Sequence, residues 1–357
     1  GDEKCESMDT IIEKIDPGNI DADVMDRAGK LIAEGELVAF PTETVYGLGG
    51  DALDPDASRK IYAAKGRPSD NPLIVHIAEF DDMKRVAREV PEQARKLADA
   101  FWPGPLTMIV WKSDAVPEAT TGGMQTVAVR MPNHPVALEL IRRSGCLIAA
   151  PSANTSGRPS PTEAQHVAED LSGKIAMILD GGPVGIGIES TIIDLTEEKP
   201  MILRPGYITP EMLSEVLQEE VVIDPGIIAA DDTRKPKAPG MKYKHYAPKA
   251  EMIIVDGAQD AVIAKINELT AAKRAEGKKV AVIATDETKE RYDAQVILSM
   301  GRRSDEDAIA QHLYKILREC DELEVGEIYS ECFQTPRIGQ AIMNRLLKAA
   351  GHTVIHV

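Results

Sequence analysis

The chain carries a dense polar loop at Lys65-Gly66-Arg67-Pro68-Ser69-Asp70-Asn71-Pro72-Leu73, which leads directly into an apolar segment, residues 73–77. The two prolines fix φ at about −65° and bias the residues before them, Arg67 and Asn71, toward extended backbone. A stiffened loop that presents two cations and an amide is suited to holding an anion. The alternative is an ordinary solvated surface, because lysine and arginine are mostly exposed in proteins.

Length and composition limit the class of protein. With 357 residues, of which 43% are hydrophobic, we expect two domains with cores of their own, at roughly 100–200 residues per domain. No stretch approaches the run of about 20 apolar residues that a membrane helix needs. The acidic first ten residues do not resemble a secretory signal. The four cysteines show neither CxxC nor Cys/His spacing, so we expect reduced thiols, a cytoplasmic protein and no zinc site.

The charge of the chain bears on its partners. The formal net charge is −17 and the isoelectric point is about 4.9. A protein that grips nucleic acid neutralises phosphates with a basic face, so we expect no stable binding of tRNA. A local basic cleft remains compatible with this charge, and it would suit a small anion such as a nucleotide.

Apolar segments and amphipathic segments alternate through the first 223 residues. Periodicity and end signals predict helices at residues 21–34, 56–64, 81–89, 91–101 and 210–217. Short apolar runs predict strands at residues 37–40, 73–77, 106–111, 126–131, 146–150, 175–179 and 189–195, with a further strand ending near Arg204. The pattern is that of an α/β protein.

Polar stretches follow two of these predicted strands. Pro41-Thr42-Glu43-Thr44-Val45-Tyr46-Gly47-Leu48-Gly49-Gly50 comes after the first, and we predict that it is a loop. Pro151-Ser152-Ala153-Asn154-Thr155-Ser156-Gly157-Arg158-Pro159-Ser160-Pro161-Thr162 comes after residues 146–150. Strand ends are where α/β proteins bind ligands. The alternative is that both are polar turns without a ligand.

Single polar residues inside apolar strands are harder to interpret. His76 is either a packing residue or a functional one. Arg130 must extend its charge to solvent or find an anion. The glycine run at residues 181–187 lacks GxGxxG spacing, and GxxxxGK[ST] is absent, so an ATP site here would not be a P-loop.

The second half of the chain changes character at residue 224. Residues 224–249 contain four prolines and mixed charge, and we interpret them as a linker that carries the basic and aromatic stretch Pro239-Gly240-Met241-Lys242-Tyr243-Lys244-His245-Tyr246-Ala247-Pro248. Beyond it, predicted strands at 252–255, 280–284, 294–298, 327–329 and 353–357 alternate with helices at 260–274, 305–319 and 337–349. Ser304 and Asp307 resemble a capping box for the second helix. Alternation predicts a small parallel sheet, and we find no chemical motif in this part.

Taken together, the ordered motifs resemble those of the YrdC-like family. They are Pro41-Thr42-Glu43-Thr44-Val45-Tyr46-Gly47-Leu48, Lys65-Gly66-Arg67-Pro68, Pro151-Ser152-Ala153-Asn154, Glu189-Ser190-Thr191 and Leu203-Arg204-Pro205-Gly206. The stretch His245-Tyr246-Ala247-Pro248 and the C-terminal αβ part resemble the two-domain threonylcarbamoyl-AMP synthases of that family. This resemblance implies a YrdC-like catalytic domain at 11–223, with a twisted mixed sheet around a concave cavity. It also implies a linker or lid at 224–249 and a smaller Rossmann-like αβα domain at 250–357.

The resemblance also implies an activity. The family joins L-threonine, bicarbonate and ATP into threonylcarbamoyl-AMP and pyrophosphate, for the N6-threonylcarbamoyladenosine modification at tRNA position 37. We expect Mg²⁺ to enter with ATP rather than in a protein cage, and the product to pass to a downstream tRNA threonylcarbamoyl transferase.

Residue roles follow from the resemblance alone. The catalytic set corresponds to Lys65, Arg67, Ser152 and Asn154. L-threonine would be surrounded by Thr44, His76, Arg130, Ser152 and Ser190. ATP would be held by Arg67, Asn71, Thr126, Asn154, Thr162, Arg204 and Tyr246, with Tyr246 folding over the cavity from the linker.

Two other activities fit parts of the pattern. Relatives with this fold resemble RNA-binding or ribosome-assembly factors, although the acidic charge argues against that class here. Hydrogenase-maturation proteins use a similar domain with carbamoyl phosphate, but this chain lacks the cysteine pairs that accompany it there.

Overall fold

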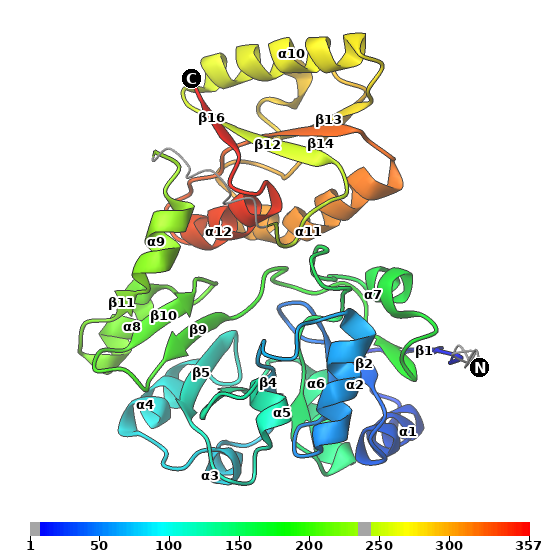
Figure 1. Cartoon of the computed structure of the whole chain (residues 1–357), viewed down its shortest axis with the longest axis vertical. Coiled ribbons are helices and arrows are strands. Elements are labelled where there is room, and N and C mark those ends of the chain that lie inside the picture. The colour runs from blue at the N-terminus through cyan, green and yellow to red at the C-terminus, as the bar shows by residue number, and fades with distance from the viewer. Residues whose placement is uncertain (1–7, 235–243) are drawn as a thin grey trace.

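The computed structural model describes residues 8–234 and 244–357. Within these residues the chain forms two sheets, one of 11 strands and one of five, with helices packed on both (Figure 1). The predicted α/β class with a large mixed sheet is therefore confirmed. Cys5 and residues 235–243 of the predicted linker, which include Pro239-Gly240-Met241-Lys242-Tyr243, lie outside the described residues. None of the described helices is both long and apolar enough to span a membrane.

The large sheet has the order β1-β8-β2-β3-β7-β4-β6-β5-β9-β10-β11 and mixes parallel with antiparallel neighbours. Its strands are β1 (Ile11–Lys14), β2 (Val38–Pro41), β3 (Tyr46–Asp51), β4 (Ile74–His76), β5 (Leu106–Trp111), β6 (Thr126–Arg130), β7 (Ile148–Ala149), β8 (Met177–Asp180), β9 (Thr191–Asp194), β10 (Met201–Arg204) and β11 (Val222–Ile223). Strand β4 runs parallel to β6 and antiparallel to β7, so His76 and Arg130 lie side by side in register.

Helices cover the faces of this sheet. They are α1 (Ala22–Ala33), α2 (Pro55–Lys65), α3 (Met83–Val86), α4 (Glu92–Phe101), α5 (Glu118–Thr121), α6 (Pro135–Ser144), α7 (Ala164–Leu171) and α8 (Pro210–Leu217), with a 3₁₀ turn at η1 (Phe80–Asp82). Helices α1 and α6 pack together over a cluster that includes Phe40 and Ile148. The sequence analysis did not predict α6 or α7, and the helix expected at 81–89 is only η1 and the short α3.

The ends of α2 explain how the chain delivers its cationic loop. Asp54 caps the helix by accepting from the amide of Asp56, and Pro55 occupies the first turn, where its missing N–H costs nothing. Gly66 ends the helix in the left-handed region at φ 66°, which glycine adopts without a Cβ penalty. The helix therefore stops at Lys65, and the next residue that can project a charge is Arg67.

The expected loop at residues 41–50 is wrong, because the glycine-rich part of it forms β3, paired with β2. A Cβ on Gly49 would lie 2.8 Å from side-chain atoms of both Ile148 and Phe40. The glycines therefore permit close packing inside the sheet rather than a turn. This pairing holds Thr42 and Thr44 at a tight corner between two buried strands.

The C-terminal part builds the second sheet, whose neighbouring strands are all parallel, as predicted. Its strands are β12 (Glu251–Asp256), β13 (Val280–Ala284), β14 (Val296–Ser299), β15 (Glu327–Glu331) and β16 (Val354–His356), and its helices are α10 (Gln259–Ala275), α11 (Glu306–Glu322) and α12 (Gly339–Ala349), with a 3₁₀ turn η2 (Lys289–Arg291). The residue that caps α11 is Asp305, which accepts from the amide of Ala308, so the expected cap at Ser304 is wrong. A helix, α9 (Pro225–Asp231), occupies the start of the predicted linker.

Helices α11 and α12 lie on the side of the second sheet that faces the first, whereas α10 covers the opposite side (Figure 1). The loop before β9 meets α11 at Gly187, where a Cβ would lie 2.7 Å from the carbonyl oxygen of Ala310. Gly187 has φ +96°, and its amide donates to the carbonyl oxygen of Thr44. One contact between the two parts is therefore a close backbone approach, two residues from Glu189 in the chain.

We expect Gly187→Ala to lower the midpoint of thermal unfolding, because the new methyl group must push α11 away and occupy a left-handed backbone. Overpacking of this kind typically costs about 1–3 kcal/mol. Gly182→Ala is the matched control, since Gly182 also has positive φ (+84°) but a Cβ there meets nothing within 4 Å. Equal unfolding midpoints for the two variants would contradict the close approach.

Candidate active site

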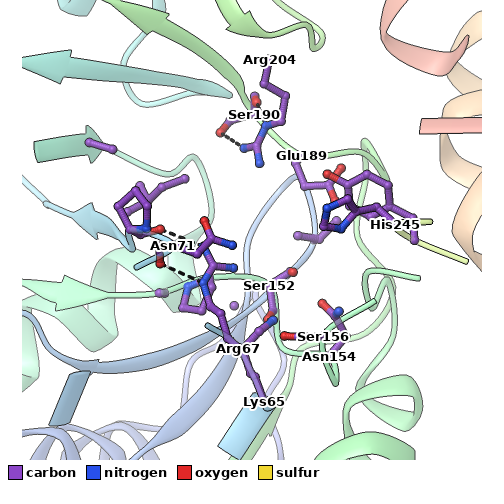
Figure 2. A pocket seen from close by; sticks show the side chains of 18 of the residues that line it. Lys65, Arg67, Asn71, Ser152, Asn154, Ser156, Glu189, Ser190, Arg204 and His245 are labelled. Carbon is purple, nitrogen blue, oxygen red and sulfur yellow. Dashed lines mark hydrogen bonds between the residues drawn. The ribbon is translucent and has the colours of Figure 1, made fainter. Parts of the chain in front are cut away.

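The described residues form a cavity of about 610 Å³ between the large sheet and the end of the linker (Figure 2). Its polar lining consists of Thr42, Thr44, Lys65, Arg67, Asn71, His76, Arg130, Ser152, Asn154, Ser156, Arg158, Glu189, Ser190, Arg204, Lys244, His245 and Tyr246. Figure 2 shows Arg204 and Ser190 on one side of this space and Arg67, Asn71 and Ser152 on another. Segments far apart in the sequence are thus brought together.

Arg67 holds the loop that follows α2, whereas Lys65, the last residue of α2, binds the segment that follows β7. The Lys65 ammonium donates to the carbonyl oxygen of Ser152, and its side chain is almost fully buried. Burial, with Arg67 close by, lowers the pKa of Lys65 well below its usual value. Arg67 donates from Nε to the carbonyl oxygen of Asn71 at 3.1 Å and from Nη2 to that of Pro72 at 2.8 Å. Burial lowers the Arg67 pKa to about 10.

Arg204 and Ser190 form the opposite wall. Arg204 donates from Nε to the carbonyl oxygen of Ser190 at 2.9 Å and from Nη2 to its hydroxyl at 3.1 Å. The Ser190 hydroxyl also shares a hydrogen bond with Thr107 at 2.8 Å. Burial lowers the pKa of Arg204. The Ser190 hydroxyl is therefore held from both sides, and the guanidinium has no carboxylate among these partners.

Arg130 found its anion within the protein. Its Nη1 donates to the Thr44 hydroxyl at 3.0 Å, its Nε donates to the carbonyl oxygen of Gly104 at 3.2 Å, and its Nη2 forms an ion pair with Glu43. The arginine is 4% exposed. Sequence reasoning missed Glu43, although it stands inside one of the motifs that carry the resemblance.

His76 is buried beside Arg130, and its Nδ1 lies 3.0 Å from the carbonyl oxygen of Ile74. Burial, followed by the positive charge of Arg130, lowers the His76 pKa to about 3. The imidazole is therefore neutral at physiological pH.

Asn154 presents a free acceptor to the cavity. Its Nδ2 donates to the carbonyl oxygens of Thr155 at 2.9 Å and Arg158 at 3.2 Å. Its Oδ1 is buried and has no hydrogen-bond partner among the described residues. A buried polar atom normally has a partner, so this oxygen is placed to accept from a ligand.

Glu189 is the only carboxylate among the described residues that line the cavity. It accepts from the Ser160 hydroxyl at 2.6 Å, from the Tyr314 hydroxyl at 2.7 Å and from Arg345 Nε at 3.1 Å. Burial alone would raise its pKa, but Arg345 and Arg204 outweigh burial and bring it to about 2. We did not predict Tyr314 or Arg345, since no motif surrounds them. The available signal was an arginine inside the apolar run of α12.

The end of the linker lies against the cavity through Tyr246. The amide of Ala247 donates to the carbonyl oxygen of Gly157 at 2.9 Å, and that of His245 donates to the carbonyl oxygen of Lys348 at 3.1 Å. Tyr246 itself has φ +56°, which is uncommon for a residue with a side chain. Its ring packs against that of Tyr314, with centroids 5.4 Å apart.

Two predicted ATP residues lie outside the cavity lining. Thr126 begins β6, opposite Trp111 and four residues before Arg130. Thr162 is buried, and its amide donates to Nδ1 of His166 at 3.2 Å. The other predicted site residues line the cavity, while the role of each one stays a prediction.

Comparison with known proteins places the chain in a family. A family model described as "Telomere recombination" matches residues 30–206, and one described as "Threonylcarbamoyl-AMP synthase, C-terminal domain" matches residues 208–351. The threonylcarbamoyl-AMP synthase of Pyrococcus abyssi is 53% identical over 331 residues, which cover 92% of this chain and 95% of the relative. The chain belongs to the threonylcarbamoyl-AMP synthase family.

Other members of the threonylcarbamoyl-AMP synthase family are also similar to this chain over most of its length. The relative from Bacillus subtilis is 50% identical over 330 residues, which cover 92% of this chain and 93% of the relative. The crystal structure of P. abyssi Sua5 complexed with L-threonine is 50% identical and matches with a TM-score of 0.89 over 98% of this chain and 100% of that one. The predicted family, function and enzyme class, a nucleotidyltransferase that forms threonylcarbamoyl-AMP, are confirmed.

The neutral, buried His76 predicts an acid sensitivity of folding. An unfolded histidine binds a proton below a pKa of about 6.5, whereas the folded one resists it, so stability falls as pH drops below that value. Between pH 7 and pH 5 the loss attributable to His76 should be about 2 kcal/mol. Urea unfolding should therefore show wild type losing more stability than His76→Gln over this range. His356→Gln, at an exposed position, is the control, and parallel losses in wild type and His76→Gln would contradict the buried neutral imidazole.

Proposed function

We propose that this cavity joins L-threonine, bicarbonate and ATP into L-threonylcarbamoyl-AMP, releasing pyrophosphate. The product would serve the N6-threonylcarbamoyladenosine modification at tRNA position 37. The observation that carries the proposal is the lining of the cavity, in which four basic residues surround hydroxyl and amide groups: Lys65, Arg67, Arg130 and Arg204. The one carboxylate in this lining, that of Glu189, already accepts hydrogen bonds from Ser160, Tyr314 and Arg345. The structural relative named as a complex with L-threonine supports the same substrate.

The chemistry accounts for this lining. The amine of threonine and bicarbonate combine to a carbamate with loss of water. An oxygen of the carbamate then attacks the α-phosphorus of ATP, and the bond to the pyrophosphate oxygen breaks. The carbamate and ATP are both anions, so fixed cations offset their repulsion and stabilise charge that grows on the phosphate oxygens.

We assign the nucleotide to the side of the cavity that holds Arg67, Asn71, Asn154 and Arg204, with Tyr246 above it. The guanidinium groups of Arg67 and Arg204 donate to backbone carbonyl or hydroxyl oxygens rather than to carboxylates. The unpartnered Oδ1 of Asn154 would accept a hydrogen bond from the nucleotide. Thr126 and Thr162 do not line the cavity and are left out of this assignment.

We assign threonine to the corner that holds Thr44, His76, Arg130, Ser152 and Ser190. Arg130 is the natural partner for a carboxylate, and here it is already oriented by Thr44 and Glu43. Neutral His76 offers a donor or acceptor without adding charge. A threonine carboxylate would therefore meet a guanidinium that is fixed in direction before the substrate arrives.

Lys65 completes the catalytic set with Arg67, Ser152 and Asn154. In the free protein burial lowers the pKa of Lys65. Phosphate groups close to it would favour the ammonium again, because an opposite charge stabilises the charged form. Entry of ATP would thus raise the pKa of Lys65.

Magnesium would enter as part of the MgATP substrate. No group of three or more His, Cys, Asp or Glu in the described parts of the chain is arranged to hold a metal ion. Glu189 is fully engaged by its own partners. The lining therefore suits a metal that is carried by phosphate oxygens.

The product would leave for a separate tRNA threonylcarbamoyl transferase, because the net charge of −17 disfavours a stable complex with tRNA. The three cysteines that the structure describes are free thiols. They support a cytoplasmic, reducing environment.

Pyrophosphate release tests the proposal. With MgATP, wild type should release pyrophosphate only when both L-threonine and bicarbonate are present. Arg67→Ala should lower the rate by about 10²–10³-fold, which is typical of removing one preorganised donor. Release without threonine would overturn the proposed substrate, and no release under any combination would favour an RNA-binding module of the same fold.

The position of Tyr246 generates a second test. Tyr246→Ala should raise the KM for ATP and increase hydrolysis of the acyl-phosphate product, because closure excludes water from the site. Tyr246→Phe keeps the ring against Tyr314 and should retain most of the closure. Kinetic constants for Tyr246→Ala that match those of wild type would refute a lid role for this residue.

A further inference from the structure

A buried cluster joins the C-terminal part of the chain to the wall of the cavity. It consists of Glu189, Ser160, Tyr314 and Arg345, and we call it the Glu189 cluster. Tyr314 belongs to α11 and Arg345 to α12, while Glu189 precedes β9 of the large sheet. Arg345 is 0% exposed and Glu189 is 6% exposed. The Arg345 guanidinium is therefore shielded from bulk water, and it pairs with a carboxylate that lines the cavity.

Arg345 bonds to the backbone on both sides of the predicted site residues. Its Nη2 donates to the carbonyl oxygen of Glu189 at 3.0 Å, and its Nη1 donates to the carbonyl oxygen of Pro205. Glu189 directly precedes Ser190, and Pro205 directly follows Arg204. One guanidinium thus ties together the two chain segments that present Ser190 and Arg204, which are themselves hydrogen-bonded to each other.

Tyr314 connects the cluster to Tyr246, at the end of the linker. Its hydroxyl donates to the Glu189 carboxylate, and its ring packs against Tyr246 at 5.4 Å between centroids. The Tyr314 side chain therefore contacts both Glu189, which directly precedes Ser190, and Tyr246, the residue proposed to close the cavity.

The cluster is a network in which each member satisfies another. Removing one partner of a buried ion pair leaves an uncompensated charge, and the neighbouring groups must rearrange to solvate it. Such a rearrangement here moves Ser190 and Arg204, because their neighbours provide the carbonyl oxygens that Arg345 binds.

We propose that Arg345 and Tyr314 are positioning residues for the synthase reaction, so that the C-terminal domain supplies part of the framework of the active site. This inference rests on the proposed function, since it assigns the held residues to ATP and threonine. Neither side chain lines the cavity, so both act through Glu189, Ser190, Arg204 and Tyr246.

A matched pair of variants separates positioning from simple docking of the two parts. Arg318 on α11 is 1% exposed and also crosses to the first part of the chain, donating to Asp170 at 2.9 Å and to the carbonyl oxygen of Pro159 at 2.7 Å. Arg318 donates no hydrogen bond to a member of the Glu189 cluster, although Pro159 directly precedes Ser160. Asp170 keeps Arg158 as a partner without it. We expect Arg345→Met and Arg318→Met both to lower the thermal unfolding midpoint.

Only Arg345→Met should weaken the binding of ATP. The Kd of this variant for ATP, measured by calorimetry, should rise about 10-fold or more, and so should its KM for ATP in pyrophosphate release. Its kcat/KM should fall by up to about 10²-fold, as expected when the reacting groups are displaced by about 1 Å. For Arg318→Met, the Kd and KM for ATP should stay within about twofold of the wild-type values. A difference this small would show that the nucleotide contacts are not displaced. Tyr314→Phe keeps the ring on Tyr246 and removes one donor, so its effect should be smaller than that of Tyr314→Ala.

A pH profile adds a readout that loss of packing does not produce. Without Arg345 the pKa of Glu189 rises, and its unpaired carboxylate at the cavity wall repels the phosphates of ATP. ATP binding by Arg345→Met should therefore strengthen relative to that of wild type as pH falls through the raised value, because protonation of Glu189 removes the repulsion. Equal Kd values for Arg345→Met and Arg318→Met would overturn the inference, as would an unchanged pH profile. Wild type that binds ATP but releases no pyrophosphate would instead overturn the proposed function, and the Kd comparison would still test the positioning.

Discussion

The candidate site depends on cations whose N–H groups are bound to neutral oxygen atoms. Lys65 donates to the carbonyl oxygen of Ser152, Arg67 to those of Asn71 and Pro72, and Arg204 to that of Ser190. A carbonyl dipole satisfies an N–H group without cancelling its charge. The cavity can therefore keep a positive potential in a low-dielectric interior while the protein as a whole is strongly acidic. That local field suits ATP, bicarbonate and the carboxylate of threonine.

Much of this arrangement could be predicted from the sequence. Pro55 and Gly66 fix the ends of α2 and so place Lys65 and Arg67, and the alternation after residue 250 indicated a parallel sheet. The ordered motifs indicated the family and most of the residues that line the cavity. These signals are local, since each depends on a few neighbouring residues and their backbone preferences.

The features that were missed depend on contacts between distant segments. The glycines of β3 suggested a turn, but their function is to let Phe40 and Ile148 approach the strand. Arg345 looked like one charge on an amphipathic helix, and its partners are 140 and 156 residues away along the chain. No periodicity in the sequence reports such a pairing. The prediction of Thr126 and Thr162 rested on resemblance alone, and the geometry does not place them at the cavity.

The dependence of the Glu189 carboxylate on hydrogen-bond partners from the second domain has a consequence for how such chains evolve. This carboxylate would lose two of its three side-chain hydrogen-bond partners in a protein without α11 and α12, because Tyr314 and Arg345 come from those helices. A lineage that loses the second domain is thus under pressure to replace the acid at this position, and one that gains the domain can acquire the acid only afterwards or together with it. Position 189 and the second domain should therefore be inherited as a unit.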